Sequence, residues 1–196
     1  MIKLSQITKD YPPRGRVLDE VQLAGLLAEL DRRRIEEERR SAVVGAHTLG
    51  SATLSTMDIG LLDWPVVGDI AYQCGVERRP NGTVLRWNGI GIRASVGTPV
   101  QAVRAGTVLV AGPLEGYGPS VILSHGGGFY TLYLYLEEIG VIEGRSVEAG
   151  QVVGTVGGQG TPEGRRLEFQ IRAPVGGGVQ EAMDPIRWLR SRGGGR

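Results

Sequence analysis

The chain has 196 residues, of which 41% are apolar and 22% are charged, and its formal net charge is +1. This length accommodates one core of ordinary size plus an appendage, and the composition excludes an extensively disordered chain. The near-neutral charge argues against nucleic acid as a partner, because phosphate binding requires a marked excess of basic residues. No apolar run approaches the roughly 18 residues that span a bilayer, and the N-terminus lacks a signal-peptide h-region.

Scarce residue types exclude several kinds of site. Cys74 is the only cysteine and His47 and His125 are the only histidines, so no internal disulfide and no Cys/His metal cluster can form. The two lysines, Lys3 and Lys9, lie near the N-terminus. Lipoyl or biotinyl carriers need a lysine in a later turn, and a phosphate-binding P-loop needs one at its end. Both functions are therefore excluded.

The N-terminal part of the chain is predicted to hold one helix between irregular segments. Residues 1–16 are interrupted by two prolines and a glycine, which excludes a regular element there. Between 17 and 42, apolar residues recur at spacings of three and four, which predicts an amphipathic helix with a solvated, ion-paired second half. Residues 43–61 are rich in glycine, serine and threonine and are predicted to be a linker.

The pattern changes to short strands from residue 62 to 190. Runs of four to eight residues rich in Val, Ile, Leu and Tyr end at glycines or at a Gly-Pro pair. This spacing predicts a mostly β domain with many tight turns. The last residues, 191–196, are predicted to be a flexible tail.

Two of the predicted strands have a polar face. In the run from 166 to 172, Leu167, Phe169 and Ile171 are expected to face the core, because successive strand residues point to opposite faces. The opposite, exposed face then carries Arg166, Glu168, Gln170 and Arg172. In the run from 130 to 137, the same alternation separates Leu132, Leu134 and Leu136 from Thr131, Tyr133, Tyr135 and Glu137. Tyrosine and arginine supply much of the binding energy at interfaces, so a binding surface and a plain structural role as β-formers are both open.

These strands also resemble the LytM-type zinc peptidases, which cut peptidoglycan cross-links. The similar segments keep the order and spacing of the family motifs over roughly residues 62 to 190. They are Trp87-Asn88-Gly89-Ile90-Gly91-Ile92-Arg93-Ala94, Gly97-Thr98-Pro99-Val100, Gly116-Tyr117-Gly118, Tyr133-Leu134-Tyr135-Leu136, Arg166 to Arg172, and Asp184-Pro185 with Trp188-Leu189. The resemblance implies a LytM-type antiparallel β-sheet or half-barrel domain preceded by the amphipathic helix.

The positions that carry the chemistry in active members have all changed. The resemblance places the three zinc ligands at Trp87, Gly91 and Glu168, and two assisting histidines at Tyr135 and Arg166. A catalytic zinc needs about three imidazole, carboxylate or thiolate ligands plus an open position for water. Glu168 alone meets that need, and Arg166 adds a permanent positive charge nearby. We therefore expect no metal, no cofactor and no enzymatic activity; a cell-wall endopeptidase with an atypical metal site is an alternative.

Among degenerate members, the chain looks most like EnvC-type murein hydrolase activators, in which a helical segment precedes an inactive LytM domain. The resemblance implies a groove that binds and switches on a peptidoglycan (N-acetylmuramoyl-L-alanine) amidase in the periplasm or cell envelope, during cell-wall remodelling or cell division. The helix would be the end of a coiled coil or a restraint across this groove. The residues expected to line it are Trp87, Gly91, Tyr117, Tyr133, Tyr135, Arg166, Glu168 and Arg172.

Two further expectations concern partners. EnvC-type activators carry a long coiled coil that engages a division-associated membrane transporter complex, and this chain starts near the end of that coiled coil without a signal peptide. We therefore expect a fragment or a misplaced start, and the resemblance implies the transporter complex as a further partner only through the coiled coil that this chain lacks. An alternative to amidase activation is that the groove holds peptidoglycan directly, with Trp87 and the tyrosines stacking on sugar or peptide.

Overall fold

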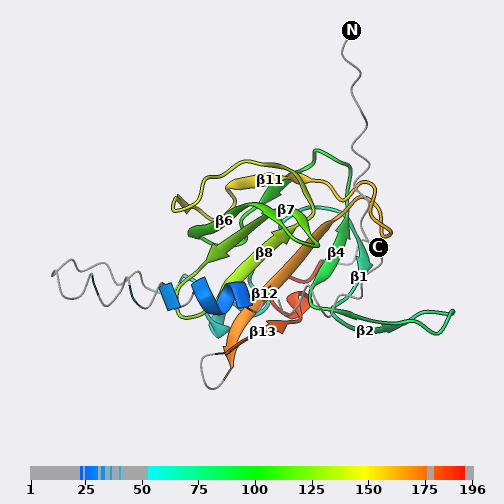
Figure 1. Cartoon of the computed structure of the whole chain (residues 1–196), viewed down its shortest axis with the longest axis horizontal. Helices are drawn as coiled ribbons and strands as arrows, with labels where there is room; N and C mark the ends of the chain where they lie inside the picture. Colours follow the sequence, from blue (N-terminus) through cyan, green and yellow to red (C-terminus); the bar gives the residue numbers. More distant parts are fainter. Residues whose placement is uncertain are drawn as a thin grey trace, which may run out of the picture.

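The computed structural model of the chain describes residues 23, 25–30, 32–33, 36, 40, 53–175 and 179–192. The predicted irregular segment, most of the predicted linker and the last four residues of the predicted tail lie outside this part of the chain. The described residues between 23 and 40 are helical, and the remainder is mostly antiparallel β structure, as the sequence predicts (Figure 1). No helix in the described part of the chain has the length and apolarity needed to cross a bilayer.

The main sheet positions the site. Within the described residues it contains eight strands, all paired antiparallel (Figure 1). In spatial order they are β1 (Asp69–Tyr72), β4 (Ile90–Arg93), β12 (Leu167–Val175), β8 (Tyr130–Leu134), β7 (Gly118–Ser124), β6 (Gly106–Leu114) and β10 (Ser146–Val147), with β13 (Val179–Met183) added to β12.

Smaller elements surround the main sheet. A second sheet joins β5 (Pro99–Gln101), β11 (Val152–Val156) and β9 (Leu136–Ile139). The strands β2 (Gly75–Arg78) and β3 (Val84–Trp87) form a separate antiparallel hairpin, which extends away from β1 and β4 in Figure 1. Short 3-10 helices lie at η1 (Thr56–Asp58) and η2 (Pro185–Arg187).

One face of the main sheet packs into the principal hydrophobic core. Leu167, Phe169 and Ile171 of β12 are fully buried in this core, which confirms the alternation predicted for that strand. Burial of a large aliphatic or aromatic side chain contributes about 1.5–3 kcal/mol, so these three positions strongly determine which face of β12 points inward.

The alternation predicted from 130 to 137 is wrong after residue 134. Tyr135 has a φ of 60°, the one positive φ among the described non-glycine residues, and it separates β8 from β9. A single such residue reverses the phase of the strand, because side chains otherwise alternate strictly. Tyr133 and Leu136 therefore lie in the principal core, whereas Leu132, Leu134 and Tyr135 belong to a second cluster on the opposite face.

A chain of hydrogen bonds holds Tyr133 on the core side. Its hydroxyl accepts a hydrogen bond from the Val103 amide at 3.0 Å and lies 3.3 Å from Thr131 Oγ1. Thr131 Oγ1 lies 2.8 Å from His125 Nε2, and His125 Nδ1 lies 2.8 Å from the Ala105 carbonyl oxygen. Because a carbonyl only accepts, the proton of the neutral imidazole lies on Nδ1. Burial lowers the pKa of His125 to about 4, which keeps this ring neutral.

The second half of the predicted linker is packed against the domain. Leu54 is fully buried in the principal core, and the Thr53 amide donates to the His125 carbonyl at 2.8 Å. The next residues form η1, whose N-cap Ser55 and Asp58 make a reciprocal capping box. The segment from 53 to 61 is therefore part of the folded domain. Its polar composition reflects these caps rather than a free connection.

Candidate functional site

The site lies on the face of the main sheet that points away from the principal core, which we call the site face. Strand register brings its members together: Glu168 pairs with Gly91 of β4 on one side and with Leu134 of β8 on the other. The face has two halves. The polar half lies over β4 and β12 and contains Gly91, Glu168, Gln170 and Arg172; the apolar half lies over β7 and β8 and contains Ile122, Tyr130, Leu132 and Leu134.

Tyr72 of β1 occupies the centre of the polar half. Its hydroxyl donates to Glu168 Oε2 at 2.7 Å and accepts from Arg166 Nε at 2.9 Å. Burial, followed by the charge of Glu168, raises the pKa of Tyr72 well above its ordinary value, so the phenol keeps its proton. The ring fits because Gly91 has no side chain: a Cβ there would lie 2.4 Å from Tyr72 Cε1. Tyr72 therefore fills the space that an aspartate at position 91 would need.

Trp87 closes the polar half from the side of the hairpin. Its ring stacks on Tyr72 with the ring centroids 3.6 Å apart and the planes inclined by 15°. The indole Nε1 donates to Glu77 Oε2 of β2 at 2.6 Å, which fixes the orientation of the ring within the hairpin. Trp87 is buried, so it functions here as an anchor that attaches the β2–β3 hairpin to the sheet.

Arg166 joins three parts of the site. Its guanidinium carbon lies 4.0 Å from the centroid of the Tyr135 ring, a cation–π contact. Its Nη1 donates to Thr161 Oγ1 at 2.5 Å and to the Gly164 carbonyl at 2.9 Å, which holds the glycine-rich loop after β11. The side chain is fully buried, and Nη2 lies 3.4 Å from Glu163 Oε2. The positive charge is therefore compensated inside the site.

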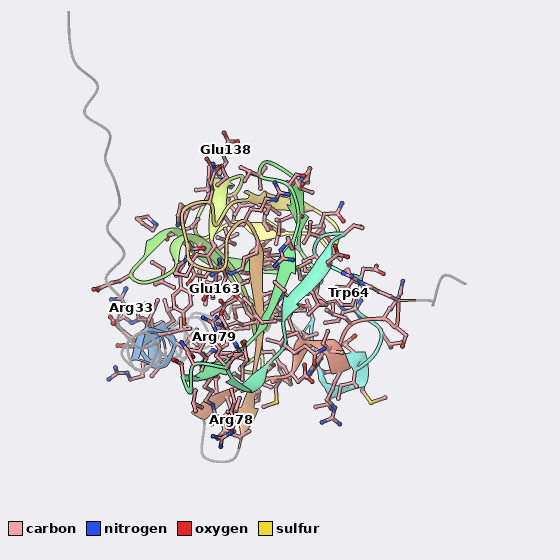
Figure 2. The ribbon with its side chains drawn as sticks, turned by 90° about the vertical axis from the view of Figure 1, so that its right-hand side faces the viewer. Arg33, Trp64, Arg78, Arg79, Glu138 and Glu163 are labelled. Atoms are coloured by element: carbon pink, nitrogen blue, oxygen red, sulfur yellow. The ribbon has the colours of Figure 1, made fainter. Side chains whose placement is uncertain are left out.

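Further ion pairs connect this loop to the hairpin. Arg79 Nη2 lies 3.6 Å from Glu163 Oε1, and Arg79 Nε lies 3.5 Å from Glu77 Oε1. Figure 2 shows Arg79 and Glu163 close together between the loop and the hairpin. Because Glu77 also accepts from Trp87, the contacts form a closed ring around the centre of the polar half.

The side chains of the polar half do not fit a zinc ion. Glu168 is the one potential ligand at the three family positions, and its two oxygens accept from Tyr72 and from Gln170 Nε2, the latter at 2.8 Å. No group of three His, Cys, Asp or Glu side chains that could hold a metal occurs in the described part of the chain. A buried guanidinium beside the carboxylate also disfavours a dication.

The apolar half is covered by the N-terminal helix. Leu23 and Leu27 are buried in one cluster with the apolar half and with Tyr117 and Tyr135, and Leu26 packs against the same cluster. Figure 1 shows the described helical residues, in blue, in front of the sheet near β8 and β12. Leu27 belongs to the three-and-four spacing that predicts the amphipathic helix, whereas Leu23 and Leu26 lie outside that spacing and join it in the contact.

The model of peptidase family M23 matches residues 85–185, just over half of the chain. The chain belongs to peptidase family M23. The matched region contains β4, β12, β8 and β7, and therefore most of the site face. Two M23 zinc-ligand positions predicted from the resemblance, Gly91 and Glu168, are paired directly across neighbouring strands. The third, Trp87, reaches the same place through its stack on Tyr72.

Known proteins with similar sequences include cell-wall proteins. The murein hydrolase activator EnvC of Escherichia coli (strain K12) is 40% identical over 129 residues, which cover 64% of this chain and 28% of EnvC. The cell division protein DipM of Caulobacter vibrioides is 34% identical, over 64% of this chain and 20% of DipM. The chain thus spans less than a third of either relative. The antimicrobial peptidase lysostaphin from Staphylococcus simulans has a similar structure, with a TM-score of 0.52, 27% identity and coverage of 62% of this chain and 49% of lysostaphin.

The structure brings five of the eight predicted site residues together and places the other three elsewhere. Trp87, Gly91, Tyr135, Arg166 and Glu168 meet in the polar half, as described above. Arg172 lies further along β12, where its Nη2 donates to Gln170 Oε1 at 3.3 Å, and Tyr117 contacts the ring edge of Tyr135 with centroids 5.8 Å apart. Tyr133 does not line the site, because it points into the principal core.

Two features of the site are not evident from the M23 motifs. The predicted polar residues are buried rather than exposed, because the hairpin, the glycine-rich loop and the helix cover them. Tyr72 was also missed, although it contacts four of the changed positions. A glycine inside a strand indicates a close approach by another group, so Gly91 is the one sequence signal for an incoming ring.

Proposed function

We propose that this M23 domain is a non-catalytic activator that binds a peptidoglycan amidase and switches it on during cell-wall remodelling or division, in the periplasm or cell envelope. The name of EnvC as a murein hydrolase activator and that of DipM as a cell division protein support this role. The donor set of the site supports the non-catalytic part, because Glu168 is already engaged by Tyr72 and Gln170 and is accompanied by Arg166.

The observation that carries the proposal is the cover on the apolar half. Leu23 and Leu27 lie on a different segment of the chain from the sheet that they cover. An apolar strip that accepts one amphipathic helix suits another helix of similar pattern, since such helices bind by inserting apolar anchors at i, i+3 and i+4. A helix of the amidase would therefore take the place of the N-terminal helix.

Activation then follows from a shift between two states. The covered state has the N-terminal helix on the apolar half, and the uncovered state presents that half to the amidase. A partner shifts such an equilibrium only by its differential affinity for the two states. Weakening the helix contact should therefore raise amidase activation, because less binding energy is consumed in displacing the helix.

The experiment measures peptidoglycan release by an envelope amidase, which is first identified by pull-down with the purified full chain. Leu27→Asp should increase activation, because a carboxylate cannot be buried on the apolar half. Ala28→Asp is the matched control, since Ala28 is exposed on the same helix and should leave activation unchanged. A gain of activation cannot result from misfolding, so an unchanged Leu27→Asp variant would reject the covered-state mechanism.

The site residues are tested by loss of binding. Replacing Tyr135 and Arg172 by alanine should each weaken amidase binding by about 2 kcal/mol, as expected for hot-spot residues. The double variant is introduced into the Leu27→Asp background, where the helix no longer competes. Full activation by this variant would reject the site. Retention of the chain on purified sacculi without any amidase would instead support direct peptidoglycan binding, and bound zinc in metal analysis would support a peptidase.

A further inference from the structure

A second surface lies on the other side of the main sheet from the helix. Its segments pack through Leu54, Leu62, Trp188 and Leu189 into the principal core, whereas Leu23 and Leu27 of the helix pack on the opposite face. In Figure 2 the helix lies on the left and Trp64 on the right. We call this the aliphatic-arginine surface; it comprises Met57, Ile59, Leu61, Trp64, Val67, Ile186, Arg187, Arg190 and Arg192.

Large aliphatic side chains are concentrated and well exposed here. Met57 is 83% exposed, Val67 is 88% exposed and Leu61 is 53% exposed. Five of the ten exposed large hydrophobic side chains in the described part of the chain belong to this surface. Scattered exposed aliphatics are normal on a soluble protein, but such a concentration indicates a contact surface.

The surface is built on a fixed framework. The Leu62 amide donates to the Trp188 carbonyl at 3.0 Å, and the Arg190 amide donates to the Leu62 carbonyl at 2.8 Å. Trp64 Nε1 donates to the Arg190 carbonyl at 2.8 Å, and Asp63 pairs with the Arg190 side chain. The protruding side chains therefore stand on two segments that are joined to each other.

Two arginines of this surface keep an uncompensated charge. Arg192 lies over the Trp64 ring, 3.6 Å from its centroid, and its Nη1 donates to the Gly68 carbonyl. Arg192 and Arg187 form no ion pair with any residue that the structure describes. Their charges are therefore available to an anionic partner, in contrast to that of Arg190.

This combination matches the chemistry of a membrane interface better than that of a protein groove. Met57 and Val67 protrude, and protruding aliphatics can enter the boundary between headgroups and acyl chains. Tryptophan prefers the headgroup level, and each arginine near an anionic leaflet contributes about 1 kcal/mol. We infer that the aliphatic-arginine surface binds the anionic headgroup layer of a phospholipid membrane, with Met57, Leu61 and Val67 as the inserted side chains.

The aliphatic-arginine surface and the site face lie on opposite sides of the main sheet. A domain resting on the membrane through the aliphatic-arginine surface would present its helix and the site face on the other side. Membrane contact and partner binding are then compatible. The inference does not depend on the proposed amidase, because it uses different residues on the opposite side of the sheet.

The experiment uses the full chain and vesicles of phosphatidylcholine, either pure or with 30 mol% phosphatidylglycerol, a probe composition that is about one-third anionic lipid. Co-sedimentation should occur with the anionic vesicles and weaken as salt rises. Trp87 and Trp188 are buried, so a blue shift of tryptophan emission on binding reports chiefly on Trp64. Arg187→Glu combined with Arg192→Glu should lower the partition coefficient by about 30-fold or more, the equivalent of the two arginine contributions.

Insertion is tested separately from charge. Met57→Asp with Leu61→Asp should abolish the blue shift, whereas Ile142→Asp, at a 72% exposed isoleucine outside the surface, should leave it unchanged. Matching thermal unfolding curves establish that each variant is folded. Absence of binding to anionic vesicles, equal losses in the Ile142→Asp control, or a concentration-dependent dimer that buries Trp64 without lipid would each overturn the inference.

Discussion

The two halves of the site face are closed in different ways. In the polar half, the strands and loops of the domain itself fill the position that the resemblance predicts for the M23 metal, with Tyr72 between Glu168 and Arg166. In the apolar half, the strands present an apolar surface that is covered by Leu23 and Leu27 from a separate helix. One half is therefore part of the folded core, and the other is a docking surface that already holds an occupant.

The polar half is therefore expected to matter for stability, and the apolar half for partner binding. A buried ion pair is costly to open, because each uncovered charge loses its partner. By contrast, one amphipathic helix can replace another on an apolar strip, because the strip makes few directional contacts. We therefore expect a partner to displace the helix and to leave the ring of contacts around Tyr72 intact.

The largest expected effect comes from a substitution that breaks the polar half. Glu168→Ala removes the acceptor of Tyr72 and Gln170 and leaves Arg166 without its nearby carboxylate on β12. Removing one member of a buried charged network costs about 3–5 kcal/mol, which urea unfolding would measure. Glu138→Ala on the exposed side of β9 is the control and should change stability by less than about 0.5 kcal/mol. A similar small change for Glu168→Ala would mean that the polar half is not part of the core.

Acid should destabilise the core side of the sheet, where His125 is buried. Folding lowers the pKa of His125 from 6.5 to about 4, so the unfolded chain binds more protons between these values. The free energy of unfolding should therefore fall by about 3 kcal/mol as the pH drops through this window, and this contribution should be complete at neutral pH. His125→Gln should remove the step in a series of urea unfolding curves. An unchanged pH profile would contradict the assignment.

Opening the apolar half should cost the domain less. Leu27→Asp removes about 1.5–3 kcal/mol of helix docking, the amount expected for one buried leucine, but leaves the sheet core unaltered. Trypsin should then cut faster at Arg32 and Arg33 while unfolding of the sheet, followed by near-ultraviolet circular dichroism, stays the same. Ala28→Asp provides the comparison with an equal charge at an exposed position. Cooperative loss of the whole domain would show that the helix belongs to the core.

The smallest expected effect probes the fit of Tyr72. Gly91→Ala places a Cβ 2.4 Å from the Tyr72 ring, and overpacking of this kind costs about 1–3 kcal/mol. Because Trp87 stacks on the same ring, its fluorescence should also change. Gly112→Ala on β6 is the matched control, since its Cβ meets nothing within 4 Å. Equal stability of the two variants would mean that Tyr72 can move aside without loss.

Much of the architecture could be predicted from the sequence. Alternation on β12 predicts its core residues, because burial of Leu167, Phe169 and Ile171 dominates over other preferences. The three-and-four spacing of apolar residues predicts an amphipathic helix, and Leu27 of that spacing is buried against the sheet. The amino acids at the M23 ligand positions also indicate that zinc is not held, since the chemistry of a tryptophan or glycine side chain does not depend on its surroundings.

The tertiary structure alone decided which side chains reach the site. The phase reversal at Tyr135 turns that residue toward the helix and sends Leu136 into the core, and no local pattern marks Tyr135 for a positive φ. Tyr72 comes from a strand distant in sequence from its partner Glu168, so spacing could not pair them. Residue types determine what each side chain can do, but contacts between distant strands determine which of them meet and which are covered.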